Sequence, residues 1–376
     1  MHTLSDPPVL PAKALEAPPR TLALSFTGEG KEYFRIWVVN LLLSLATLGI
    51  YSAWAKVRRL QYFDRNTMLA GASFDFHGNP KAILTGRALA LVLLVAYHYA
   101  FGFSTGFGLA VIGALLLALP YLMRGALRFR LGNTTYRGLW LGFDGPVRQA
   151  YLAWLPPALV LLLPGVLLSL YPTQPAMAAA VLPLYLFWPL MHARIRRFQH
   201  AHLLFGDQHS TYALGARRFY RPYIMAGALA LLTVLVTGVV TAFVGIAAGA
   251  GKIGAQVAAL FTAVAAVYVV YLLAGPYMVV RVSNLAWSHT AFPGMRIRST
   301  LPARGFMKLQ TKNALLTVLT LGLYRPFAVV NVYRFRLAHV HIDVDGDIGT
   351  AAHMAGRRGG AAGDGAADGF GIDLSW

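Results

Sequence analysis

Residues 222–280 read PYIMAGALALLTVLVTGVVTAFVGIAAGAGKIGAQVAALFTAVAAVYVVYLLAGPYMVV, and this stretch decides the class of the protein. Lys252 is the only Asp, Glu, Lys or Arg among its 59 residues. A helix needs about 17–25 residues to cross the hydrocarbon core of a bilayer. The stretch therefore predicts two membrane-crossing helices joined by the glycine-rich turn around Lys252.

Two more segments have the same character. Residues 88–123 and 149–193 contain no Asp, Glu, Lys or Arg, and each is interrupted by a turn-forming sequence, FGFSTGFG in the first and YPTQP in the second. Of all 376 residues, 57% are hydrophobic and 12% are charged, whereas a soluble domain is about one-quarter charged. We expect three helical hairpins, and hence six membrane spans, in an α-helical integral membrane protein.

The basic residues orient these spans. The segments 56–87, 124–148, 194–221 and 281–312 hold 23 of the 33 Lys and Arg residues, whereas the hairpin tips hold only Lys252. Cytoplasmic loops of membrane proteins carry this excess of positive charge. The pattern predicts a bacterial inner-membrane protein with its long loops in the cytoplasm. It also explains the net charge of +19 without nucleic-acid binding, and it favours contact between the Arg-rich loops and anionic lipid headgroups.

Composition divides the chain into three parts. Residues 1–21 are rich in proline and lack an apolar core, so we expect a disordered arm. Residues 22–348 form the multi-pass membrane domain. Residues 349–376 are rich in Gly and Ala and are expected to be a disordered tail. The chain has no cysteine, which excludes disulfides and thiol chemistry.

Internal repeats are the most specific signal in the sequence. NLLLSLATLGIYSAWA at 40–55 matches NALLTVLTLGLYRPFA at 313–328, and NTMLAGASFDFHG at 66–78 matches NTTYRGLWLGFDG at 133–145. A Phe-x-Gly triplet recurs at Phe26, Phe76 and Phe143, and we expect its glycine to adopt a backbone conformation that a Cβ would strain. The loops are thus built from one unit, an Arg-rich helix end followed by a short alternating strand and a new helix. The fold class expected is an all-α polytopic membrane protein with short cytoplasmic β-strands in its loops, including one in HIDVDGD at 341–347.

FTGEGKEYFRIW, TLGIYSAWAKVRR, NTMLAGASFDFHG and TLGLYRPF together make the chain resemble the YjgN family of bacterial inner-membrane proteins. The resemblance covers roughly residues 22–348. It implies a multi-pass bacterial membrane protein and brings no known substrate, cofactor or catalytic residue.

A duplicated polar stripe is the candidate functional feature. Its spacing of i, i+4, i+7 and i+11 places each set on one helical face. Two interpretations remain open: hydrogen bonds between helices, or the lining of a polar path. The residues are Asn40, Ser44, Thr47 and Tyr51 in the first copy and Asn313, Thr317, Thr320 and Tyr324 in the second.

The apolar segments that contain these stripes, 36–55 and 313–330, have basic residues at both ends, so charge does not orient them. The C-terminal copy has only 12 uncharged residues before Arg325. We expect that copy not to cross fully but to dip into or lie along the cytoplasmic leaflet, which leaves both termini in the cytoplasm.

The sequence predicts no catalytic, metal or cofactor site. Every Asp and Glu lies outside the apolar runs, which disfavours transport coupled through a carboxylate in the membrane. His200, His202 and His209 lie near Asp207, and His339 and His341 precede Asp343. Neither group has the ligand spacing of a zinc site. We also expect no enzymatic activity, since no nucleophile lies beside a base.

Two functional interpretations remain. The first is a carrier, channel or exporter component, which the duplicated polar helices favour by analogy with transporters. The alternative is a membrane scaffold or assembly factor that binds a partner through its cytoplasmic loops. Substrate, protein partner and oligomeric state are left open.

Overall fold

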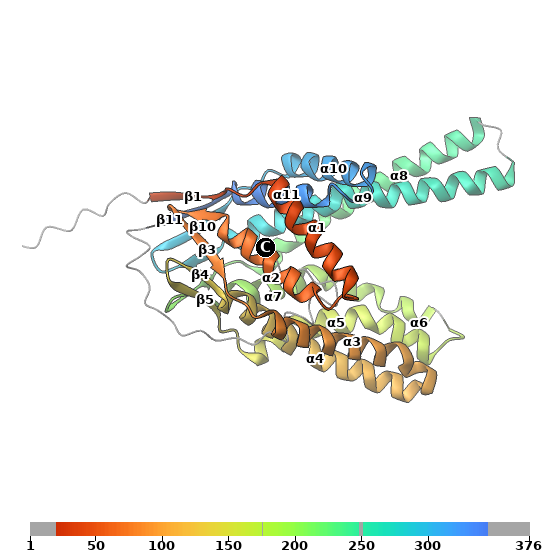
Figure 1. Cartoon of the computed structure of the whole chain (residues 1–376). Coiled ribbons are helices and arrows are strands. Elements are labelled where there is room, and N and C mark those ends of the chain that lie inside the picture. The colour runs from red at the N-terminus through yellow and green to blue at the C-terminus, as the bar shows by residue number, and fades with distance from the viewer. Residues whose placement is uncertain (1–19, 175, 248–250, 345–376) are drawn as a thin grey trace, which may run out of the picture.

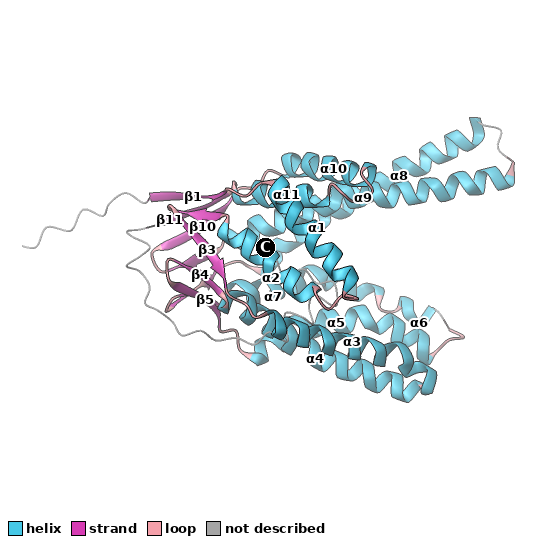
Figure 2. Cartoon of the chain, viewed as in Figure 1, coloured by secondary structure: helices cyan, strands magenta, loops and turns pink. Residues whose placement is uncertain are grey.

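The computed structural model describes residues 20–174, 176–247 and 251–344. The strands gather at one end of the molecule, and the long helices project from them in the opposite direction (Figures 1 and 2). Parts of the disordered arm and tail expected from composition, residues 1–19 and 349–376, lie outside the described residues, as do residues 345–348.

Three long helical hairpins supply the membrane spans. Within the described residues, six helical segments are long and apolar enough to cross a membrane, as the uncharged runs predict. The side chains of these segments are largely exposed in the isolated chain, which is the arrangement expected when lipid surrounds them. The elements are α3 (Pro80–Phe103) with α4 (Thr105–Gly132), α5 (Val147–Leu170) with α6 (Ala176–Ala179), η1 (Leu182–Phe187) and α7 (Trp188–His200), and η2 (Ala216–Phe219), α8 (Tyr220–Ala247) with α9 (Lys252–Trp287).

The two segments with polar stripes form shorter hairpins that turn back. Helix α1 (Gly30–Ala46) is followed by α2 (Ser52–Arg65), and α10 (Ala303–Leu319) by α11 (Arg325–Leu337). The chain reverses at Leu48-Gly49 and at Leu321-Gly322, where all four residues have positive φ. Both ends of each hairpin connect to strands. Both copies therefore reverse and return to the sheet.

Eleven strands form one antiparallel sheet, so the expectation of an all-α protein is wrong. The sequence indicates several of these strands, but each has only two to seven residues and none is stable alone. The sheet order is β7-β6-β5-β4-β3-β2-β1-β11-β10-β9-β8. The strands are β1 (Arg20–Phe26), β2 (Thr67–Leu69), β3 (Ala72–Phe76), β4 (Thr134–Tyr136), β5 (Leu139–Phe143), β6 (Leu203–Phe205), β7 (Gln208–His209), β8 (Thr211–Tyr212), β9 (Thr290–Phe292), β10 (Met295–Ser299) and β11 (Val340–Val344).

The sheet curls into a nearly closed barrel. Its two outermost strands, β7 and β8, are consecutive in the chain and are separated only by Ser210. The Ser210 hydroxyl donates to the carbonyl of His200 and accepts from the amide of Leu203, at 2.9 and 2.8 Å. The first and last strands, β1 and β11, pair with each other in the middle of the sheet order. The barrel therefore holds the two ends of the membrane domain together.

One helix-ending device recurs in every repeat. The side chain of the residue just before the strand donates a hydrogen bond to the carbonyl four residues earlier, in the last turn of the helix. Asn66 and Asn133 donate their amides to Tyr62 and Phe129 in this way. The corresponding residues in the other three repeats are histidines, at 2.8–3.0 Å through Nδ1: His202, His289 and His339.

The Phe-x-Gly triplets have a different cause from the one expected. Gly28, Gly78 and Gly145 are absent from the residues with positive φ. Instead, each glycine lies under the ring of the phenylalanine two residues earlier. A Cβ on Gly145 would lie 2.6 Å from the ring of Phe143 and 2.8 Å from that of Phe198. The glycine is needed because two rings fill the space where a side chain would go.

Candidate ligand chamber

A chamber of about 980 Å³ extends from the interior of the barrel along the helices. Its barrel end is lined by apolar side chains that belong to a core cluster, among them Leu69, Phe205 and Met295. Its walls beyond the barrel come from α2, α4, α9, α10 and α11. On α9 the lining runs from Trp287 to Tyr271, about 24 Å at 1.5 Å per residue.

The chamber reaches the outside of the molecule at the end away from the barrel. Tyr271 of α9 and Val318 of α10 both line it, and they are 71% and 72% exposed. Both side chains lie on helices that carry exposed apolar residues around this point. The mouth therefore opens where the surface is apolar, and the closed end is the barrel core.

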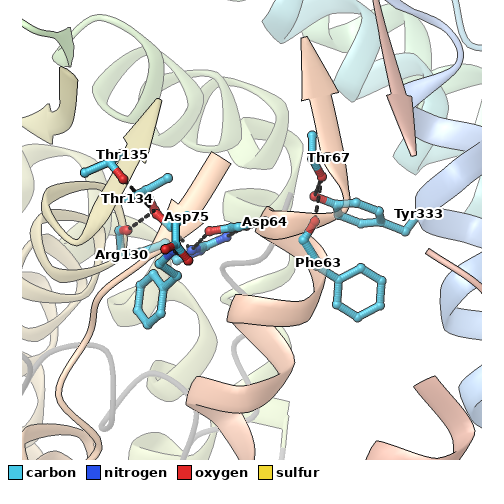
Figure 3. Close-up of polar contacts among 9 residues, drawn as sticks. Phe63, Asp64, Thr67, Asp75, Arg130, Thr134, Thr135 and Tyr333 are labelled. Carbon is cyan, nitrogen blue, oxygen red and sulfur yellow. Dashed lines mark hydrogen bonds and ion pairs between the residues drawn. The ribbon is translucent and has the colours of Figure 1, made fainter. Parts of the chain in front are cut away.

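Four arginines line the chamber beside the apolar surface, and Asp64 is the one acidic residue among the described lining residues. The carboxylate of Asp64 is paired with one of these arginines. Arg130 Nη1 and Nη2 donate to the two carboxylate oxygens of Asp64, each at 2.8 Å (Figure 3). The arginines are Arg59, Arg130, Arg325 and Arg336.

The Asp64–Arg130 pair is buried. The Asp64 side chain is 5% exposed and that of Arg130 is 13% exposed. Arg130 Nη1 also donates to Thr134 Oγ1 at 3.2 Å, and its guanidinium lies over the ring of Phe76 at 5.1 Å from the centroid. The pair joins α2 to α4 across 66 residues of sequence and forms part of the chamber wall.

A second polar contact joins α11 to the barrel. The Thr67 hydroxyl donates to the carbonyl of Phe63 at 2.7 Å, so the Tyr333 hydroxyl, 3.0 Å away, donates to Thr67 (Figure 3). Burial and then the negative charge of Asp64 raise the pKa of Tyr333. The phenol therefore stays neutral and holds α11 against β2.

Arg59 of α2 and Arg325 of α11 both line the chamber. Both act electrostatically on Tyr33 of α1, where burial raises the phenol pKa and the two guanidinium groups oppose that rise. Within residues 20–174, 176–247 and 251–344, no carboxylate pairs with either arginine. Two cationic side chains from α2 and α11 thus face the chamber without a counter-charge from the described part of the chain.

The polar stripes divide between structural and chamber-facing residues. Thr47 Oγ1 donates to the carbonyl of Leu43 and accepts from the amide of Tyr51. Thr320 repeats this arrangement with Leu316 and Tyr324. These threonines stabilise the reversals of the short hairpins.

Two residues of the second stripe, Asn313 and Thr317, line the chamber. Tyr324 instead accepts a hydrogen bond from Asn331 at 3.2 Å. Asn40, Ser44, Thr47 and Tyr51 of the first stripe are not part of the lining. The structure therefore does not bring the two stripes together as the walls of one path.

The histidines have separate roles. His202 and His339 end helices, as described above, and the His209 ring lies 3.0 Å from Asp144. His200 is fully buried and lies 3.0 Å from Thr290. In the described part of the chain, no group of three or more His, Cys, Asp or Glu side chains could hold a metal ion.

Sequence reasoning missed the residues that make the chamber polar. In the sequence, nothing distinguishes Arg59, Arg130 and Arg325 from the other arginines of the basic loops. Asp64 likewise has no distinctive neighbour in the sequence. The internal repeat contains one signal that singles out Arg325: this arginine occupies the position that Ser52 has in the matching copy.

Comparisons with known proteins support the membrane assignment. The chain is similar to "Inner membrane protein YjgN" of Salmonella typhimurium, with 36% identity over 157 residues, 39% of this chain and 38% of the relative. It is also similar to the proteins of that name from Escherichia coli O157:H7 and strain K12, with 29% and 28% identity over 125 residues, 32% of this chain and 30% of each relative.

These alignments span less than two-fifths of each relative's length. No solved structure matches the chain. The profile of a family described as "Bacterial protein of unknown function (DUF898)" matches residues 21–369. This match covers the membrane domain and nearly all of the barrel, and the chain therefore belongs to that family of bacterial proteins.

Proposed function

We propose that the protein is a membrane carrier or exporter component that takes up an anionic amphiphile in the chamber. The observation that carries the proposal is the combination of an apolar closed end with two arginines in the chamber wall, Arg59 and Arg325. Guanidinium groups bind carboxylate and phosphate through paired hydrogen bonds. An acyl chain suits the apolar barrel, and an anionic headgroup suits the arginines.

The size and shape of the chamber support uptake. Its volume of about 980 Å³ is at the upper end of the range for small-molecule sites. Its mouth lies between exposed apolar residues of α9 and α10, from which a lipid in the bilayer has direct access. The core cluster at the barrel end closes the chamber, which favours binding and transfer over open conduction.

The scaffold alternative receives less support. A partner strand would need a free sheet edge, but the loop strands pair with one another, and the outermost strands β7 and β8 are each only two residues long. The arginines inside the chamber have no role in that alternative.

Replacing Arg59 and Arg325 together by Gln tests the proposal. A hydrogen bond to a charged group contributes about 1.5–3 kcal/mol, so we expect the double variant to lose at least tenfold in anionic-phospholipid affinity. Native mass spectrometry of the full chain with added phosphatidylglycerol measures the affinity. Arg296→Gln is the control, because Arg296 is exposed on β10 and is not part of the lining. Equal affinity of the double variant and the wild type would exclude the chamber as the binding site.

We further propose that the barrel is cytoplasmic and that the tips of the short hairpins enter the cytoplasmic leaflet. The supporting observations are the basic residues around the barrel and the apolar tips, where Leu48 and Leu321 are 96% and 95% exposed. Leucine is unfavourable at positive φ, and both tips nevertheless have it. An apolar environment around the two tips explains why leucine occupies these positions.

Single cysteines test this topology, because the chain has none of its own. With a membrane-impermeant maleimide, we expect Gly251→Cys to react in intact spheroplasts and Ala70→Cys to react only after permeabilisation. Leu321→Cys should stay unreactive in both cases because lipid covers it, and should react after detergent solubilisation. Labelling of Ala70→Cys in intact spheroplasts would reverse the proposed orientation, and labelling of Leu321→Cys in membranes would show that the tip is in water.

A further inference from the structure

We infer that the ligand of this chamber carries a hydrogen-bond donor next to its anionic group, as in a glycerophospholipid with free hydroxyls on its headgroup. The inference rests on the proposed function and specifies the ligand for the same chamber. It depends on Asn313, whereas the proposed function depends on the arginines and the apolar barrel.

Asn313 presents an unsatisfied acceptor at the chamber wall. Its side chain is 3% exposed, and its Nδ2 donates to the carbonyl of Ala328 at 3.4 Å. Its Oδ1 is buried and has no hydrogen-bond partner among the described residues. Rotating the amide would place Oδ1 against the Ala328 carbonyl oxygen, so the contact with Ala328 fixes Oδ1 as the free atom. A buried carbonyl oxygen without a donor costs free energy, and a ligand hydroxyl would remove that cost.

The position of Asn313 relative to Arg325 suits a short polar headgroup. Ala328, which Asn313 contacts, lies three residues after Arg325 on α11, about 4.5 Å along the helix axis at 1.5 Å per residue. That distance is on the scale of a three-carbon headgroup beyond its phosphate. A phosphate held by Arg325 would therefore place a headgroup hydroxyl within reach of Asn313.

Neighbouring residues on α10 extend the polar wall. Gln310 and Thr317 lie three residues before and four residues after Asn313 and also line the chamber, so the three side chains follow one face of the helix. Thr317 uses its hydroxyl proton on the carbonyl of Asn313 at 2.7 Å. Its oxygen therefore remains an acceptor. The wall beside the arginines accepts hydrogen bonds, which selects for a headgroup that donates them.

The internal repeat supplies a matched control. Asn40 is the counterpart of Asn313, is 8% exposed, and also has a buried Oδ1 without a partner in the described structure. Asn40 does not line the chamber. A substitution at Asn40 thus reproduces the loss of a buried asparagine and leaves the ligand wall intact.

The experiment is a lipid competition measured by native mass spectrometry on the full chain. The two lipids are phosphatidylglycerol and phosphatidylmethanol, which have the same charge and the same acyl chains and differ in the headgroup hydroxyls. We expect the wild type to prefer phosphatidylglycerol by about two- to tenfold, the effect of one hydrogen bond. Asn313→Leu should bind both lipids with a ratio near one, and Asn40→Leu should keep the wild-type ratio.

The outcomes separate this inference from the proposed function. If neither lipid binds the wild type, or if Arg59→Gln with Arg325→Gln leaves binding unchanged, the proposed function fails. If both lipids bind the wild type equally, the headgroup inference fails alone. It also fails if Asn40→Leu removes the preference as fully as Asn313→Leu does. The ratio of the wild-type affinities for the two lipids tests the headgroup inference even if Asn313→Leu does not fold.

Discussion

Asp64→Leu is expected to destabilise the protein by about 3–5 kcal/mol, because it leaves the guanidinium of Arg130 buried without its carboxylate. Folded proteins are stable by only about 5–15 kcal/mol, so the variant should give little folded material. Arg130 donates two hydrogen bonds of 2.8 Å to Asp64, and both side chains are nearly removed from water. Thermal unfolding in detergent, with the yield of monodisperse protein from size-exclusion chromatography, measures the loss.

A double variant distinguishes the unpaired charge from general damage. Asp64→Leu with Arg130→Met replaces the pair by apolar side chains, and such replacements of buried ion pairs are often neutral or stabilising. We expect the double variant to recover most of the stability that Asp64→Leu loses. A double variant as unstable as the single one would show that the pair contributes mainly through its contacts with Thr134 and Phe76.

Gly145→Val is expected to destabilise the protein by about 1–3 kcal/mol or more, the usual cost of forcing extra atoms into a packed core. Its Cβ would overlap the rings of Phe143 and Phe198, which are only 5% and 3% exposed. Both rings belong to one buried cluster that joins the barrel to α5 and α7. The measurement is the midpoint of thermal unfolding in the same detergent.

Gly165→Val in α5 is the matched control, because nothing lies within 4 Å of the position where its Cβ would be. We expect it to change the midpoint much less. If Gly145→Val unfolds at the wild-type temperature, the two rings can move aside. If it also removes lipid binding at unchanged stability, the triplet has a functional role that the packing does not explain.

Local features of the sequence were sufficient for several parts of the structure. Uncharged runs predict membrane spans because hydrocarbon rejects charge over a fixed thickness, and the six spans follow from that alone. The matching Thr-Leu-Gly-Tyr sequences indicate two equivalent hairpins, and their reversals have nearly the same backbone angles, φ of 50° and 91° in one and 48° and 92° in the other. The short strands at Phe74 and Leu139 were likewise visible as alternating patterns.

The pairing of strands that are far apart in the chain could not be predicted from the sequence. Strands of two to seven residues have no stability of their own, and the barrel exists because the helices bring every loop to the same level, where β1 meets β11 across more than 300 residues. The all-α class expected from the sequence is therefore wrong, although alternating patterns predict several of the strands individually. The tertiary structure also separates charges that look alike in sequence: Arg130 is neutralised by Asp64, whereas Arg59 and Arg325 face the chamber.

The sequence by itself determined which segments enter the membrane, because that depends on the composition of each segment. Only the tertiary structure decided where the chamber lies and which side chains line it, because these depend on contacts between segments far apart in the chain.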